Sequence, residues 1–326
     1  MILKFLMIAF FVTCVMCGPH SHKSSGSKES VENVASVPRG NNHYKDGKHN
    51  YEFDHESVLG SQHLAEEFEH LPAEEAKIRL HMLALKMDAN NDQFVDRKEL
   101  TNWVLKSFKT LTIEESMDEL EDVDSDGDAQ ITWEEHIAET FGIYEDELSL
   151  SQESEEEYQM LQNDKELFNA ADIDGDGILN KAEYPSFSHP EEFEHMHQIV
   201  FEQAMRKRDR NQDGYLSFEE FVSDSYGSTP QPTTEQYIME KDRFMTDYDL
   251  DGDNKLNKEE VLLWLIPNNV ETAQSEADHL IESSDTDKDG KLSFEEIVNH
   301  HEIFVGSEAT DFGEQLKESN RYTDEL

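Results

Sequence analysis

Six acidic segments of one design repeat along this chain of 326 residues. Each places a carboxylate or amide side chain at its first, third and fifth positions and a glutamate at its twelfth. Side-chain oxygens at this spacing suit a hard divalent cation, because Ca²⁺ takes about six to eight oxygen ligands at roughly 2.3–2.6 Å. The segments cover residues 88–99, 124–135, 172–183, 209–220, 249–260 and 285–296, and we number them loops 1 to 6.

This ligand spacing is that of the EF-hand calcium loop, which uses side chains at positions 1, 3 and 5, the backbone carbonyl of position 7 and a bidentate glutamate at position 12. We therefore predict up to six Ca²⁺ sites. The predicted ligands are Asp88, Asn90, Asp92, Phe94 and Glu99 in loop 1, Asp124, Asp126, Asp128, Gln130 and Glu135 in loop 2, Asp172, Asp174, Asp176, Ile178 and Glu183 in loop 3, Asp209, Asn211, Asp213, Tyr215 and Glu220 in loop 4, Asp249, Asp251, Asp253, Lys255 and Glu260 in loop 5, and Asp285, Asp287, Asp289, Lys291 and Glu296 in loop 6.

The sixth position of an EF-hand loop needs a positive φ, which glycine adopts at low cost. Loops 3, 4 and 6 have glycine there, and loop 5 has Asn254, which tolerates the left-handed conformation. Loops 1 and 2 have Gln93 and Ala129, for which that conformation costs about 1–2 kcal/mol. We expect sites 1 and 2 to be the weakest.

Two nearby glycines raise the question of register. Moving loop 2 to start at residue 122 would bring Gly127 to position 6 but Trp133 to position 12, and moving loop 5 to start at 247 would bring Gly252 to position 6 but Lys258 to position 12. Neither tryptophan nor lysine can supply a calcium ligand from its side chain, so these registers are rejected.

Position 8 is apolar in every loop, reading Val95, Ile131, Leu179, Leu216, Leu256 and Leu292. A solvated acidic repeat without metal would not keep an apolar residue there. We expect this residue to join a short two-stranded pairing between partner loops.

The steps between loop starts are 36, 48, 37, 40 and 36 residues. The short steps favour pairing loop 1 with 2, 3 with 4 and 5 with 6, because a single hand cannot bury its apolar face alone. Apolar residues at helical spacing flank the loops, such as Ile78, Leu80, Leu83, Leu85 and Met87 before loop 1, and we interpret them as core. The predicted fold is all-α, with six EF-hands in three paired lobes at 71–145, 158–227 and 235–305.

Residues 1–17 are typical of a signal peptide, with Lys4 before a short apolar core. Both cysteines, Cys14 and Cys17, lie in this segment. The apolar run is too short to span a membrane, which needs about 20 residues, and no second run follows, so we expect no stable membrane insertion. Residues 18–70 are expected to be largely disordered. Histidines 20, 22, 43 and 49 in this segment could bind a transition metal, although histidines in a disordered segment are usually just solvated.

The remaining segments are predicted to be linkers and a tail. An acidic linker covers 146–157 and contains the candidate phosphorylation sites Ser151 and Ser154, and a proline-containing linker covers 228–234. The tail, 306–326, ends in Thr-Asp-Glu-Leu, which resembles the KDEL and HDEL retrieval signals except at Thr323.

The net charge of −47 argues against nucleic-acid and anionic-membrane partners and favours basic proteins and Ca²⁺. The six loops contribute 23 carboxylates at ligand positions 1, 3, 5, 9 and 12. These groups repel one another without metal, so we expect the calcium-free protein to expand and calcium to compact it.

Several stretches outside the loops are similar to one family. They are residues 53–56 (FDHE) with Leu59 and Gly60 just after, 189–196 (HPEEFEHM), 264–267 (WLIP), 276–280 (EADHL) and 304–314 (FVGSEATDFGE). With the six loops and the tail, they make residues 51–326 resemble the CREC family of luminal multiple-EF-hand proteins, most of all calumenin and the reticulocalbins. The chain departs from that family at Thr323, Gln93 and Ala129.

The resemblance implies a low-affinity calcium binder of the secretory pathway that makes chaperone-like or regulatory contacts with luminal client proteins, such as the calcium pump and the vitamin-K-dependent carboxylation system. The main hypothesis is therefore a non-enzymatic calcium buffer of the endoplasmic reticulum lumen. Two alternatives are a secreted extracellular or matrix protein and a calcium sensor that exposes a hydrophobic target groove. We expect no enzymatic activity, because no nucleophile elbow, phosphate-binding loop or zinc-ligand spacing occurs.

Overall fold

The computed structural model describes residues 44–45, 48–142, 155–223 and 235–306. These residues are mostly helical, with only two-stranded sheets between them, which confirms the predicted all-α class. The α-helices are α1 (Tyr51–Leu59), α2 (Gln62–Glu69), α3 (Ala73–Met87), α4 (Arg97–Val123), α5 (Trp133–Phe141), α6 (Glu155–Ala171), α7 (Tyr184–Ser188), α8 (His197–Arg208), α9 (Phe218–Phe221), α11 (Glu235–Arg243), α12 (Lys258–Leu265), α13 (Asn269–Ser284), α14 (Phe294–Asn299) and α15 (His301–Phe304).

The strands are β1 (Tyr44–Lys45), β2 (Lys48–His49), β3 (Phe94–Asp96), β4 (Gln130–Thr132), β5 (Ile178–Asn180), β6 (Leu216–Ser217), β7 (Lys255–Leu256) and β8 (Lys291–Ser293). Strands β3 to β8 each lie in one of the six loops. Short 3₁₀ turns cover Pro190–Glu192 and Glu194–Met196, and a π-helical turn at Phe244–Tyr248 leads into loop 5.

The loops themselves start the helices that follow them. In loop 1 the position-9 Asp96 side chain accepts a hydrogen bond from the Glu99 N–H, and the position-12 Glu99 side chain bonds back to the Asp96 N–H. This is a capping box, which satisfies helix N–H groups that would otherwise lack partners. Loops 2, 4, 5 and 6 have the same box, so the ligand pattern also fixes where each exiting helix begins.

The loops pair, but not in the predicted combinations. Antiparallel strand pairs join loop 1 to loop 6, loop 2 to loop 3 and loop 4 to loop 5. The position-8 residues face each other in every pair, as expected: Val95 with Leu292, Ile131 with Leu179 and Leu216 with Leu256. The predicted pairing of 1 with 2, 3 with 4 and 5 with 6 is therefore wrong, and so are the lobe boundaries built on it.

Helix α4 explains the error. It runs without interruption for 27 residues and serves both as the exiting helix of loop 1 and as the entering helix of loop 2. At 1.5 Å per residue it is about 40 Å long, so it holds these two loops far apart. Where two loop starts are only 36 or 37 residues apart, the exiting helix of the first loop either is the entering helix of the second or is followed closely by it. The longer steps, of 48 and 40 residues, separate the consecutive loops that do pair, loop 2 with loop 3 and loop 4 with loop 5.

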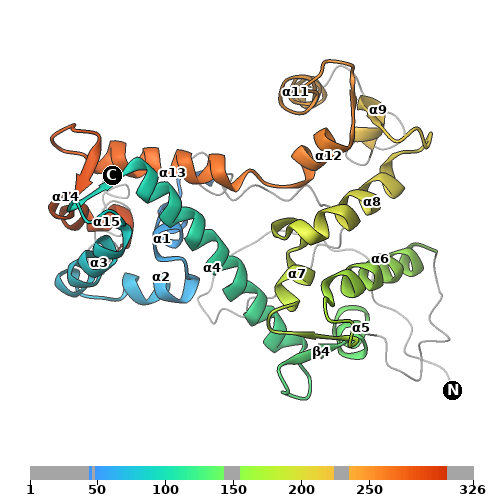
Figure 1. The fold of residues 1–326 in the computed structure, drawn as a ribbon, viewed down its shortest axis with the longest axis horizontal. Helices are drawn as coiled ribbons and strands as arrows, with labels where there is room; N and C mark the ends of the chain where they lie inside the picture. Colours follow the sequence, from blue (N-terminus) through green and yellow to red (C-terminus); the bar gives the residue numbers. More distant parts are fainter. Residues whose placement is uncertain (1–43, 46–47, 143–154, 224–234, 307–326) are drawn as a thin grey trace, which may run out of the picture.

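The three loop pairs are therefore connected in a ring (Figure 1). Helix α4 leads from pair 1–6 to pair 2–3, α7 and α8 lead from pair 2–3 to pair 4–5, and α12 and α13 lead back to pair 1–6. The ring closes where α13 packs along α4. Each loop pair has its own apolar core.

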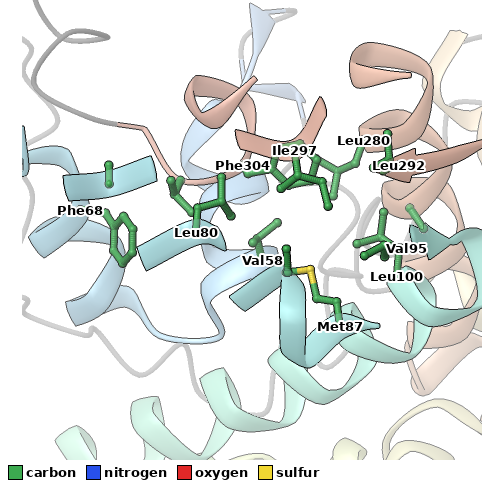
Figure 2. Close-up of a cluster of buried hydrophobic side chains, with 14 residues drawn as sticks. Val58, Phe68, Leu80, Met87, Val95, Leu100, Leu280, Leu292, Ile297 and Phe304 are labelled. Atoms are coloured by element: carbon green, nitrogen blue, oxygen red, sulfur yellow. The ribbon is translucent and has the colours of Figure 1, made fainter. Parts of the chain in front are cut away.

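Residues 51–69 correct a second expectation. They belong to the segment predicted to be largely disordered, but they form α1 and α2 and contribute to the core of pair 1–6. Val58 and Phe68 are buried there beside Leu80 and Phe304 (Figure 2). The Trp103 indole N–H of α4 also donates to the Val58 carbonyl at 2.7 Å. These few apolar residues are enough because the pair supplies the rest of the core.

The predicted signal peptide, Ser151 and Ser154, and the Thr-Asp-Glu-Leu tail lie outside the described residues. Within the described part of the chain, no helix combines the length and the apolar character that a membrane crossing requires.

Candidate metal-binding loops

The backbone of all six loops turns through the left-handed region at position 6. Gln93, Ala129 and Asn254 have φ values of 73°, 63° and 69° there, and the glycines of loops 3, 4 and 6 have 81–83°. The prediction that glutamine and alanine adopt this conformation in loops 1 and 2 is confirmed. Because an L-residue rarely adopts it without support, the loop must hold these two residues in place.

Position 4 is also left-handed in every loop, which the sequence reading missed. The residues there are Asn91, Gly127, Gly175, Gln212, Gly252 and Lys288, with φ between 57° and 77°. This placement explains Gly127 and Gly252: they serve the turn at position 4. Trp133 and Lys258, which the rejected registers placed at position 12, are instead the first residues of α5 and α12.

The position-1 aspartate of each loop points inward and accepts backbone N–H groups. In loop 3 the Asp172 carboxylate accepts from the Asp176 N–H at 3.2 Å and from the Gly177 N–H at 2.8 Å. In loop 1 the Asp88 carboxylate accepts from the Gln93 N–H at 2.9 Å. These bonds fold the loop around the carboxylate, so the left-handed residue at position 6 also helps to hold position 1.

The position-12 glutamate joins the two ends of its loop. In loop 5, Glu260 Oε1 accepts the Leu250 N–H at 2.8 Å, and Glu260 Oε2 accepts the Asn257 N–H at 2.9 Å. Glu260 is almost completely buried, with 3% of its surface exposed. Both oxygens of the carboxylate are thereby directed at the loop, which is the orientation that a bidentate ligand needs.

Carboxylate oxygens converge in four of the loops. One oxygen from each of three residues lies within 4.8 Å of the others in loops 2, 3, 5 and 6, and the residues are Asp124, Asp126 and Glu135, Asp172, Asp174 and Glu183, Asp249, Asp251 and Glu260, and Asp285, Asp287 and Asp289. Loops 1 and 4 have asparagine at position 3. In loop 4 the Asn211 amide donates to Glu220 Oε1 at 3.1 Å, so the same positions meet there.

The converging groups have opposed electrostatic demands. In loop 6 the Gly290 N–H holds the pKa of Asp285 below its ordinary value. The pKa of Asp287 is raised, first by desolvation and then by the charges of Asp289, Glu296 and Asp285, which outweigh the bond from the Asp289 N–H. Like charges held this close favour a bound cation over a proton at neutral pH.

Two lysines contact the neighbouring loop of their pair, which the sequence reading also missed. Lys291 Nζ of loop 6 lies 3.1 Å from Asp92 Oδ2 of loop 1, and Lys255 Nζ of loop 5 lies 2.7 Å from Asp213 Oδ2 of loop 4. Each lysine holds the pKa of its aspartate below the ordinary value. Only the backbone carbonyls of these lysines were predicted to matter, because the side-chain contact depends on a pairing that was not foreseen.

Helix α3 departs from the predicted core pattern on one side. Leu80 and Met87 are buried, but Ile78, Met82 and Leu85 are 64%, 52% and 52% exposed. Their spacing places them along one face of the helix. We call these three residues the α3 stripe.

Comparisons with known proteins agree with the loop geometry. An EF-hand domain pair matches residues 241–300, an EF hand matches 201–223, and a second EF-hand domain pair matches 152–188. The 241–300 match covers loops 5 and 6, although in this structure they pair with loops 4 and 1.

Curated relatives match most of the chain. Reticulocalbin-2 of Crotalus adamanteus is 37% identical over 286 residues, which is 86% of this chain and 93% of the relative. Reticulocalbin-2 of Mus musculus is 36% identical, over 87% of this chain and 90% of the relative. Reticulocalbin-3 of Rattus norvegicus is 35% identical, over 87% of each chain.

Proposed function

The chain belongs to the CREC family of calcium-binding EF-hand proteins, close to the reticulocalbins, and from this premise we propose that it is a non-enzymatic, low-affinity calcium buffer of the endoplasmic reticulum lumen. The observation that carries the proposal is the common geometry of the six loops. Each has left-handed residues at positions 4 and 6 and an inward-facing position-12 glutamate.

We propose one Ca²⁺ per loop, held by the residues predicted from the sequence at positions 1, 3, 5, 7 and 12. Sites 1 and 2 are the weakest, because Gln93 and Ala129 strain the turn. Affinities at the weak end of the EF-hand range, about 10⁻⁴–10⁻³ M, suit a calcium-rich compartment.

The proposed location depends on the two ends of the sequence. The signal-like start directs the chain into the secretory pathway, and the Thr-Asp-Glu-Leu end acts in retrieval. A tagged chain should accumulate in cell lysate, and the T323K variant should be retained at least as well. Recovery of the unaltered chain mainly from the medium, with T323K still retained, would favour the secreted alternative.

Client proteins are proposed to be basic and amphipathic. The net charge of −47 attracts basic groups of a client. The α3 stripe offers an exposed apolar surface for the apolar face of the same client. A synthetic basic amphipathic peptide should bind in calcium, and the I78E/L85E variant should bind it more weakly. The control is I113E, which changes another exposed isoleucine, on α4. Equal binding by all three chains would remove the α3 stripe from the proposal.

The central experiment titrates Ca²⁺ into the mature chain while heat and far-UV circular dichroism are recorded. We expect several sites near the millimolar range and a gain of helix, since metal binding and folding are coupled. The E183Q/E220Q variant should lose two of the sites. Sub-micromolar binding to an already folded chain would favour the sensor alternative, and an absence of binding would overturn the proposal.

A further inference from the structure

Three metal-ligating side chains from separate parts of the chain meet outside the six loops. His49 comes from β2, Asp54 from α1 and His279 from α13. His49 Nε2 lies 3.2 Å from Asp54 Oδ2, and His279 Nε2 lies 3.5 Å from the same oxygen. One ligand atom from each residue lies within 4.8 Å of the other two.

This cluster differs from a surface ion pair because its carboxylate is buried. The Asp54 side chain is completely buried, and the His49 and His279 side chains are 20% and 29% exposed. A carboxylate removed from water needs strong compensation. Another carboxylate, Glu276, lies one turn before His279 on the same helix and is also buried, with 2% exposed. A dication would balance this negative charge, and the partly exposed imidazoles give it a route from solvent.

The spacing fits a tetrahedral metal ion. Zinc binds imidazole nitrogen and carboxylate oxygen at about 2.0–2.2 Å, which places neighbouring ligand atoms about 3.3 Å apart. The two distances to Asp54 Oδ2 are close to this value. The imidazole rings of His49 and His279 lie side by side, with centroids 4.8 Å apart and planes inclined by 40°.

We propose that His49, Asp54 and His279 form a transition-metal site of the Zn²⁺ type, separate from the calcium loops. Two nitrogens and one carboxylate suit a borderline metal such as zinc, whereas Ca²⁺ prefers oxygen ligands alone. Three protein ligands leave a fourth position for water.

The position of the site gives it a structural consequence. Helix α1 packs on α4 and α15, and α13 packs on α4. A metal ion here connects β2 and α1 to α13, the helix that enters loop 6, so it strengthens the place where the ring of hands closes. Metal binding to the folded form alone stabilises that form by mass action.

The test uses Co²⁺ as a spectroscopic probe for the full mature chain, with millimolar Ca²⁺ present to fill the loops. His20, His22 and His43 lie outside the described residues. They are replaced by glutamine in the parent and in every variant, so that they cannot bind the metal. We expect one equivalent of Co²⁺ with the visible absorption of a four-coordinate ion, and we expect Zn²⁺ to displace it.

H279Q and H49Q should each weaken Co²⁺ binding at least about 10–100-fold, the range found when even an outer-shell partner is lost. The matched control is H70Q, an exposed histidine at the end of α2, which should bind like the parent. Because H279Q alters α13, H49Q on the short strand β2 keeps the test valid if H279Q folds poorly. Absence of binding by the parent, or equal binding by the parent and H49Q, would overturn the proposal.

Discussion

Loop pairs 1–6 and 2–3 have the same backbone design but balance their charge differently. Each pair carries nine carboxylates within its two twelve-residue loops. Pair 1–6 also holds four cationic residues, Arg97, Lys98, Lys288 and Lys291, whereas pair 2–3 holds only Lys181. The formal charges of the loops are therefore −5 and −8. Two bound Ca²⁺ ions would nearly neutralise pair 1–6 and leave pair 2–3 at −4.

The contacts follow the same division. In pair 1–6, Lys291 contacts Asp92 of the neighbouring loop, and Arg97 forms a bidentate pair with Asp278 of α13. In pair 2–3, position 7 is occupied by Gln130 and Ile178, which carry no charge. The same loop design can therefore balance its carboxylates with cationic side chains of its own or depend on the bound ion for that balance. Pair 2–3 should depend on calcium more strongly.

The largest effect on the stability of each loop pair is expected from substitutions at position 8. Leu179→Ala and Leu292→Ala each remove a completely buried side chain and should cost about 2–5 kcal/mol of stability. Each pair contains one tryptophan, Trp103 in pair 1–6 and Trp133 in pair 2–3, so chains with a single tryptophan report on each pair separately. We expect each substitution to lower the denaturation midpoint of its own pair. Equal shifts of both reporters would show that the pairs unfold together.

The next largest effect is expected from removal of calcium, which should change the hydrogen-exchange rates of the two pairs to different extents. Hydrogen exchange after chelation should increase more in β4 and β5 than in β3 and β8, by about tenfold, because repulsion among carboxylates is least compensated in pair 2–3. Raising the salt concentration should reduce the difference by screening. Faster exchange in pair 1–6 would contradict the charge comparison.

Ala129→Gly should improve pair 2–3 by a smaller amount. Ala129 has a φ of 63°, and glycine removes the cost of that conformation, about 1 kcal/mol. We expect about a fivefold gain in the calcium affinity of loop 2, followed by Trp133 fluorescence. Gly177→Ala, at φ 83° in loop 3, should do the opposite. An unchanged affinity in both variants would show that the turn does not limit binding.

Lys291→Met should have the smallest effect. The ion pair is exposed to solvent and therefore weak, so freeing Asp92 should raise the calcium affinity of loop 1 only about twofold. Lys98→Met removes the same charge from loop 1 itself and is the control. Gln130→Lys in loop 2 should weaken binding in loop 3, because Gln130 has the same place in its strand pair as Lys291. Isothermal titration of the three variants checks the order. A larger effect of Lys98→Met would assign the result to net charge alone.

The loops could be predicted from sequence because their chemistry is local. Positions 1 to 12 determine both the hydrogen bonds and the turns, so the conformations of Gln93 and Ala129 followed from a ligand pattern. The pairing is not local, but a signal for it was present. Residues 97–123 contain neither glycine nor proline, as expected for one continuous helix. Pro267, between α12 and α13, marks where the path does bend.

The remaining features depend on which segments meet. The contact between Lys291 and Asp92 spans 199 positions, and Asp54 meets His279 across more than two hundred. No spacing rule connects residues so far apart. Residues 51–69 were misjudged for the same reason, since their few apolar side chains become a core only against α3, α4 and α15.

The pairing of loop 1 with loop 6 also has a consequence for the order of folding during synthesis. The first hand to leave the ribosome finds its partner strand only when the last hand has been made, whereas pairs 2–3 and 4–5 can form as soon as each second member appears. Loop 1 ends at residue 99 and loop 6 at residue 296. At synthesis rates of about 5–20 residues per second, the first hand therefore stays unpaired for about 10–40 s. A premature stop before residue 285 would remove the last hand and leave the first one without a partner.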